Sequence, residues 1–140
     1  MDEALKYLSR QAYSEQRLSD KLIATGFPEV EIIECCTRLK HWGYLDDREF
    51  GINRIKQLQE RLKSRSFIIS DLENRGLAKN LLTELVDSCY PEEAETEIAR
   101  KLLLKKGSTG KNQSKMWIYL LRVGFSENTV RHCFPSIDPT

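Results

Sequence analysis

Asp46 and Asp47 are adjacent carboxylates in the stretch HWGYLDDREF, and such residues can act as acids and bases or bind a metal. Both uses need further groups at suitable spacing. The chain has 2 histidines, His41 and His132, and neither has a cysteine or carboxylate at the spacing of a metal ligand. No serine lies in a nucleophile elbow, and GSTGKNQSK at residues 107–115 lacks the spacing of a Walker A loop. The sequence therefore predicts a protein that is not an enzyme and has no metal or cofactor.

The cysteines indicate a reducing environment. None of the 4 cysteines has C-x-x-C spacing, and the adjacent Cys35 and Cys36 suit neither a framework disulfide nor a zinc site. We expect buried free thiols at Cys35, Cys36, Cys89 and Cys133. No apolar run is long enough to span a bilayer, and no signal-peptide pattern opens the chain. We therefore expect a cytoplasmic protein with no membrane partner.

The elements that position these side chains are expected to be helices. Of the 140 residues, 40% are hydrophobic and 31% are charged, which predicts a folded chain with a polar surface. Only 7 glycines and 4 prolines are present, and runs of β-branched residues are few. This composition favours helices over a β-sandwich or barrel.

Three stretches repeat one pattern, in which leucine stands four residues before glycine and another apolar residue four before that. The glycines are Gly26, Gly76 and Gly124. The apolar residues that share this register are Leu18, Ile68 and Met116; Leu22, Leu72 and Leu120; Phe27, Leu77 and Phe125; Ile32, Leu82 and Val130; and Cys35, Leu85 and Cys133. Apolar residues four apart occupy one helix face, and glycine ends a helix in the left-handed conformation. The repeat therefore predicts an all-α protein built from helix-turn-helix-like units.

We divide the chain into three tandem three-helix units and a short irregular tail. The units are predicted at 1–45, 46–90 and 91–136, with the tail at 137–140. Each unit should open on a longer helix, at 3–12, 47–63 and 91–106. Ser14, Ser64 and Asn112 are expected to cap the second helices. Pro28 at N1 and Ser126 at the N-cap are expected to open third helices.

The paired carboxylates are then explained as residues at the start of a helix. Asp46 is predicted as an N-cap, with Asp47 at N1 meeting the positive end of the helix dipole. Glu49 would complete a capping box, and Leu45 and Phe50 a hydrophobic staple. Gly43 would end the preceding helix.

The stretch GYLDDREF and the L-x-x-x-G repeats around it resemble RecX, the bacterial modulator of RecA. The most specific positions are Gly43, Tyr44, Leu45, Asp46, Asp47 and Phe50. The resemblance covers nearly the whole chain and implies three three-helix modules in an elongated, curved array. Two departures are Gly51, where the family usually has alanine, and the loop LKSRSF, which lacks the glycines common there.

The resemblance also implies a partner. RecX proteins bind the RecA–single-stranded DNA filament and mainly inhibit RecA ATP hydrolysis, filament extension and strand exchange. It thus implies a regulatory protein of homologous recombination, DNA repair and the SOS response. We expect such a chain to be a monomer.

Basic residues cluster in two segments that could carry this binding. No acid stands between Glu97 and Glu127. Arg54 and Arg61 should share a helix face, with Arg65 one turn beyond if the helix persists. A solvated basic face is the plainer interpretation, but basic residues without an intervening acid suit phosphate or an acidic protein groove. The expected contact residues are Arg54, Arg61, Lys63, Arg65, Arg100, Lys101, Lys105, Lys106, Lys111 and Lys115.

A sequence-specific DNA reader is the main rival. In a helix-turn-helix module the start of the third helix faces the bases, but here the first such helix carries Glu29, Glu31 and Glu34. These carboxylates would repel phosphate. The alternative that stays open is a non-catalytic helical-repeat protein that binds single- or double-stranded DNA directly. Weak direct binding to DNA could also accompany binding to the filament.

Overall fold

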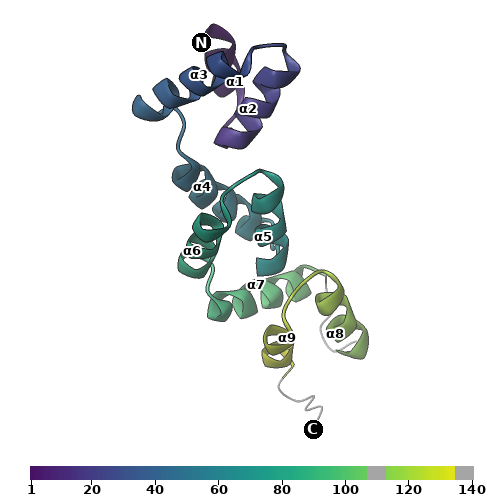
Figure 1. The fold of residues 1–140 in the computed structure, drawn as a ribbon. Helices are drawn as coiled ribbons and strands as arrows, with labels where there is room; N and C mark the ends of the chain where they lie inside the picture. Colours follow the sequence, from purple (N-terminus) through teal and green to yellow (C-terminus); the bar gives the residue numbers. More distant parts are fainter. Residues whose placement is uncertain (107–112, 135–140) are drawn as a thin grey trace.

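The computed structural model describes residues 1–106 and 113–134, in which all regular structure is helical (Figure 1). The helices follow one another along an elongated, curved array with the first and last helices at opposite ends. Their bounds are α1 (Asp2–Arg10), α2 (Glu15–Ala24), α3 (Glu29–His41), α4 (Asp47–Glu60), α5 (Arg65–Asn74), α6 (Lys79–Cys89), α7 (Glu92–Lys105), α8 (Gln113–Arg122) and α9 (Glu127–Cys133). The predicted all-α fold is confirmed. The unit boundaries at 45/46 and 90/91 remain a prediction.

The repeated glycines end α2, α5 and α8 with positive φ angles, as the pattern predicts. The angles are 99° at Gly26, 83° at Gly76 and 106° at Gly124. In each turn the residue after the glycine donates its N–H to the carbonyl of the repeated leucine, at 3.2, 3.2 and 3.0 Å in chain order. This bond is the long one of a Schellman motif. The leucine of L-x-x-x-G therefore supplies both a buried side chain and the carbonyl that closes the turn.

The predicted serine caps also form. The hydroxyl oxygens of Ser14, Ser64 and Ser126 accept from N–H groups three residues on, at 3.2, 3.1 and 3.2 Å. Pro28 is the N-cap of α3 rather than its first helical residue, so that prediction was one residue out. The cap expected at Asn112 lies outside the described residues.

The helix that follows the paired carboxylates is shorter than predicted. It ends at Glu60 because Leu62 adopts a left-handed conformation, with φ 62°, and Lys63 N–H donates to the Leu58 carbonyl at 3.0 Å. The helix therefore does not persist to Arg65, which lies at the start of α5. The other leading helices, α1 and α7, also stop short of the predicted bounds.

Asp46 caps α4 and Asp47 is the first residue of this helix, as predicted, but the predicted capping box and hydrophobic staple are wrong. Its Oδ1 accepts from the N–H groups of Arg48 at 3.0 Å and Glu49 at 3.3 Å. No return bond from the Glu49 carboxylate to the Asp46 amide forms within the described residues. Leu45 belongs to the core of the first three helices and Phe50 to that of the later ones, so they make no hydrophobic staple. Gly43 has φ 81° and ends the turn after α3.

Two hydrophobic cores support the array. The first, under α1–α3, contains Ala4, Leu18, Leu22, Ile32, Cys35, Cys36, Leu39 and Leu45. The second is continuous from α4 to the residue after α9 and includes Phe50, Ile55, Leu72, Leu85, Tyr90, Ile98, Leu120, Val130 and Phe134. We call α1–α3, α4–α6 and α7–α9 the first, second and third groups of helices. The second and third groups share one core, and the first group has a separate core.

Candidate partner interface and the joints that position it

Successive groups of helices meet at two joints, and both use the N-cap serine of a second helix. At joint 1, between α2 and the turn after α5, Ser14 Oγ donates to the Arg75 carbonyl. At joint 2, between α5 and the turn after α8, Ser64 Oγ donates to the Val123 carbonyl at 3.3 Å. Each serine thus caps its own helix and also bonds to the next group's glycine turn.

A carboxylate from the next group completes each joint. Asp47 Oδ1 accepts from the Glu15 N–H at 2.8 Å, and Glu95 Oε2 accepts from the Arg65 N–H at 2.8 Å. Asp47 precedes Gly76 by the same number of residues as Glu95 precedes Gly124. Both accept from the first amide of a helix, which has no partner within that helix. Asp47 therefore serves the start of α2, in addition to standing at the start of its own helix.

Joint 2 is the more deeply buried of the two. Glu95 is 2% exposed, and its Oε1 also accepts from Ser126 N–H at 3.2 Å and Thr129 Oγ1–H at 2.6 Å. Asp47 is only half-buried, and that partial burial raises the pKa of its carboxyl despite the bond from the Glu15 amide. The sequence interpretation missed Glu95. Its shared register with Asp47 was the signal that could have found it.

Arg54, a predicted contact residue, forms a bidentate ion pair inside the molecule. Its Nε and Nη2 donate to the two oxygens of Asp71 at 2.9 and 3.0 Å, and Arg75 Nε donates to the same carboxylate at 3.0 Å. Burial alone would raise the pKa of Asp71, but the bond from Arg54 and the charge of Arg75 lower it. Arg54 therefore links α4 to α5.

Arg65, another predicted contact residue, also makes internal bonds. Its Nε donates to the Tyr90 carbonyl at 2.7 Å and its Nη2 to Asp87 Oδ1 at 2.9 Å. The Tyr90 hydroxyl in turn donates to the Lys63 carbonyl at 2.8 Å, and burial raises the pKa of this phenol. Arg65 thus connects the start of α5 with the end of α6.

The two remaining predicted cations of the middle segment, Arg61 and Lys63, differ in their exposure to solvent. Arg61 is exposed at the C-cap of α4. Lys63 Nζ lies 4.7 Å from the centre of the Phe67 ring, and this ring is 42% exposed. Of the four predicted residues, Arg54 and Arg65 are thus bonded within the molecule, Lys63 is half-buried beside an aromatic ring, and Arg61 is exposed.

The predicted residues of α7 and the start of α8 are exposed. Arg100, Lys101, Lys105, Lys106 and Lys115 all face solvent. Arg100 Nη2 donates to the His132 carbonyl of α9 at 3.3 Å, which orients that guanidinium. Lys101 and Lys105 are one turn apart and share a face of α7. Lys111 lies outside the described residues.

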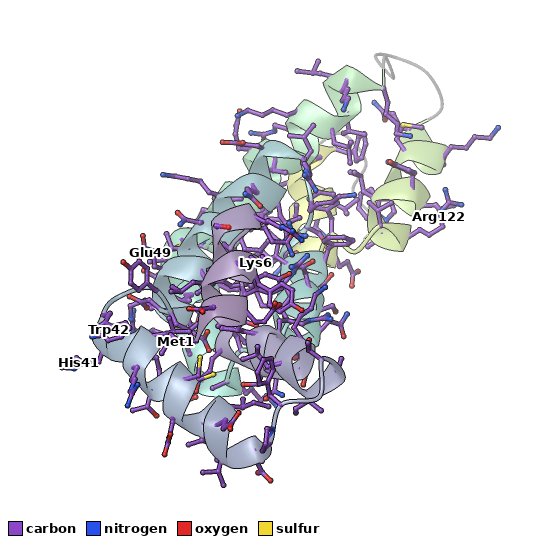
Figure 2. The ribbon with its side chains drawn as sticks, turned by 90° about the horizontal axis from the view of Figure 1, so that it is seen from above. Met1, Lys6, His41, Trp42, Glu49 and Arg122 are labelled. Atoms are coloured by element: carbon purple, nitrogen blue, oxygen red, sulfur yellow. The ribbon has the colours of Figure 1, made fainter. Side chains whose placement is uncertain are left out.

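An aromatic ring and exposed aliphatic side chains lie among these cations. Lys106 Nζ lies 4.4 Å and the Arg122 guanidinium carbon 5.7 Å from the centre of the Tyr119 ring, and Figure 2 shows Arg122 extending outward from α8. Leu104 is 68% and Ile118 62% exposed. The surface at this end of the array is therefore basic and partly apolar. We name Arg100, Lys101, Lys105, Lys106 and Lys115 the distal basic surface.

Trp117 and the cysteines contribute to packing. Trp117 is half-buried and its ring centre lies 6.1 Å from that of Phe134. All 4 cysteines are free; Cys35 and Cys36 are buried as predicted, whereas Cys89 and Cys133 are only partly so. Burial raises the thiol pKa of Cys36 and of Cys133.

The described residues hold neither a candidate metal-binding cluster nor a membrane-spanning helix. They contain no group of three or more histidine, cysteine, aspartate or glutamate side chains that could hold a metal ion. Residues 1–106 and 113–134 also contain no helix of the length and apolar character that crossing a membrane requires.

Comparisons with known proteins agree on one family. Residues 1–39 match the model of the first three-helix domain of RecX. A regulatory protein RecX of Caldanaerobacter subterraneus is 32% identical over 89% of this chain and 63% of its own length. Another, from Pelodictyon phaeoclathratiforme, is 30% identical over 89% of this chain and 80% of its own length. The chain thus spans less than two thirds of the first relative.

Solved structures show the same fold. A crystal structure of RecX from Lactobacillus salivarius has a TM-score of 0.84 and 22% identity, and the match covers 99% of this chain and 94% of that one. A crystal structure of a regulatory protein RecX has a TM-score of 0.81 and covers 97% of this chain and 71% of that one. The array of short helices is therefore an experimentally observed fold. The 30% sequence identity to the Pelodictyon phaeoclathratiforme protein extends over most of both chains. This identity, together with the shared fold, places the chain in the RecX family of regulatory proteins.

Proposed function

We propose that this protein binds the RecA–single-stranded DNA filament and mainly inhibits RecA ATP hydrolysis, filament extension and strand exchange. Membership of the RecX family supports this proposal. The action would be stoichiometric and non-catalytic, by a single chain. The partner would be met by side chains on more than one group of helices.

The observation that carries the proposal is the placement of exposed cations along the array. Arg61 lies at the end of α4, and Lys101 and Lys105 lie on α7, whereas Arg54 and Arg65 are engaged within the molecule. Cations spread along an extended chain can meet several successive subunits of a repeating partner. Several weak contacts on one chain raise the overall affinity, since each later contact forms at high effective concentration.

Direct binding to single-stranded DNA is the second candidate, and one feature favours it. Tyr119 carries two cations beside its ring, Lys106 and Arg122. Proteins that bind single strands combine cations with aromatic rings on which bases stack. The ring is half-buried, which limits the face that a base could reach. We therefore rank this candidate below the filament.

A titration separates the two candidates. The protein is added to preformed RecA–ATP–single-stranded DNA filaments while ATP hydrolysis is followed, and binding to bare single-stranded DNA is measured at matched salt. We expect inhibition at concentrations well below those that coat bare DNA. Inhibition only where free DNA is coated would identify competition for the strand, because that binding depends on phosphate and salt.

Charge reversal tests the surface itself. The variant Arg61→Glu/Lys105→Glu should weaken inhibition about tenfold or more, since two exposed cations become anions facing an acidic partner. Its matched control is Arg10→Glu/Lys79→Glu, which changes net charge equally on exposed positions of α1 and α6. Equal inhibition curves for both variants would remove Arg61 and Lys105 from the interface. Circular dichroism confirms that each remains helical.

A further inference from the structure

The two joints occupy equivalent positions in the repeat but are built differently. At joint 2 the hydrophobic core runs without interruption from α4–α6 into α7–α9. At joint 1 the core of α1–α3 ends, and a separate core begins. The bonds that cross joint 1 are polar, from Ser14 to the Arg75 carbonyl and from the Glu15 amide to Asp47.

The difference can be traced to particular residues when the repeat is aligned on its glycines. Ala12 of joint 1 corresponds to Leu62 of joint 2. Arg54 and Arg75 of joint 1 correspond to Leu102 and Val123 of joint 2. These three joint 2 residues are partly buried and pack against the shared core. Joint 1 thus has a small side chain and two arginines where joint 2 has packed aliphatic residues.

Open cavities occur where the aliphatic packing is missing. Three cavities, with volumes of about 420, 350 and 280 Å³, lie around joint 1, and Ala12 and Phe50 line all three. Space of this size lets a neighbouring group change its position without steric clash. Residues 43–46, which connect α3 to α4, begin with Gly43 at φ 81° and have no regular structure.

We propose that joint 1 is a hinge, about which α1–α3 move as one body relative to a second, rigid body formed by α4–α9. Opening the hinge breaks the Asp47–Glu15 and Ser14–Arg75 bonds and exposes little apolar surface. Opening joint 2 would expose a continuous core and break the bond from the Arg65 N–H to the buried Glu95 carboxylate. Local opening is easiest where few buried apolar contacts are lost.

Two amides report the opening of the two joints directly. The Glu15 N–H is held by Asp47 across joint 1, and the Arg65 N–H is held by Glu95 across joint 2. We would measure hydrogen exchange of both by nuclear magnetic resonance and correct each rate for its intrinsic chemistry. The hinge predicts protection of the Glu15 amide at least about tenfold lower than that of the Arg65 amide.

Two further amides distinguish a moving joint from a fraying helix. Arg17 N–H and Phe67 N–H are held by the caps Ser14 and Ser64, within their own helical groups. A hinge lowers protection at Glu15 and leaves Arg17 as protected as Phe67. Loss of protection at both the Glu15 and the Arg17 amide would show that α2 frays, and would overturn the proposal.

The matched test exchanges the residue at one repeat position, which is Ala12 at joint 1 and Leu62 at joint 2. Ala12→Leu places a larger apolar side chain at an exposed position that borders all three cavities, and should raise the protection of Glu15. Leu62→Ala should lower the protection of Arg65. Equal protection of the two amides in the unmodified protein would overturn the hinge even if neither variant folds. The measurement needs no RecA, so its failure would leave the proposed filament binding untouched.

Discussion

Replacing Glu95 by alanine should destabilise the protein far more than replacing Asp47, although both carboxylates hold the first amide of a neighbouring helix. Glu95 is buried and accepts from Arg65 N–H, Ser126 N–H and the Thr129 hydroxyl. Its removal leaves three donors without an acceptor in a site that little water reaches. Asp47 is half-buried, and its removal frees one amide close to solvent.

The size of the effect follows from these partners. A buried donor left unpaired costs about 1–3 kcal/mol, so three would cost roughly 3–9 kcal/mol. Alanine also removes the cost of burying a carboxylate, which offsets several kcal/mol. We therefore expect a net loss of about 3 kcal/mol for Glu95→Ala. For Asp47→Ala we expect about 1 kcal/mol or less.

Urea unfolding followed by circular dichroism and by tryptophan fluorescence measures both losses. Trp117 lies in α8, so its fluorescence reports on the helices that contain Glu95. Trp42, at the end of α3, is 54% exposed. All variants would carry Trp42→Phe so that Trp117 is the fluorophore that is followed. Equal losses for the two variants would refute the reasoning. They would show that the bonds of Glu95 stabilise the fold no more than a single solvent-accessible bond.

Two further predictions concern the polar links of α4. Asp46→Ala should lower the free energy of unfolding by about 1 kcal/mol, because two N–H groups of the first turn lose their acceptor; loss of RecA inhibition at unchanged melting temperature would instead assign Asp46 to the interface. Asp71→Asn should cost about 2 kcal/mol at neutral pH, since the carboxylate bonds to both Arg54 and Arg75. The pKa of Asp71 is lowered from 3.8, so its ionised form stabilises the fold above pH 3.8, and this contribution is lost as pH falls through the lowered value. The difference in urea midpoint between Asp71→Asn and the unmodified protein should therefore shrink below pH 3.8, and a constant difference would contradict the ion-pair account.

The predicted contact residues show where inference from sequence stopped. A lysine or arginine in a list of residues is a free cation until its neighbours are known. Arg54 meets Asp71 and Arg65 meets Asp87, and both acids lie at least 17 residues away in the sequence. Arg61 and Lys105 have no such partner within the described residues. Only the fold separates the arginines that bond within the molecule from the cations that face outward.

The staple predicted from Leu45 and Phe50 failed for a related reason. The spacing N′ to N4 brings two side chains together only when the same core lies on both sides of the cap. Here the cap lies between two cores. Leu45 packs in the core of α1–α3, whereas Phe50 packs in the core that begins at α4. Local spacing could not reveal that a boundary between cores falls within these residues.

The sequence by itself determined the helices, their turns and their family. Apolar residues four apart and a glycine that tolerates positive φ act within a few residues, so the pattern at Leu22 and Gly26 already specifies a helix and its end. Tertiary structure decided how the groups of helices meet. Glu95 and Asp47 share one register, yet Glu95 is buried among three donors and Asp47 is half-buried with one. Burial differs because it depends on side chains that approach from distant parts of the chain.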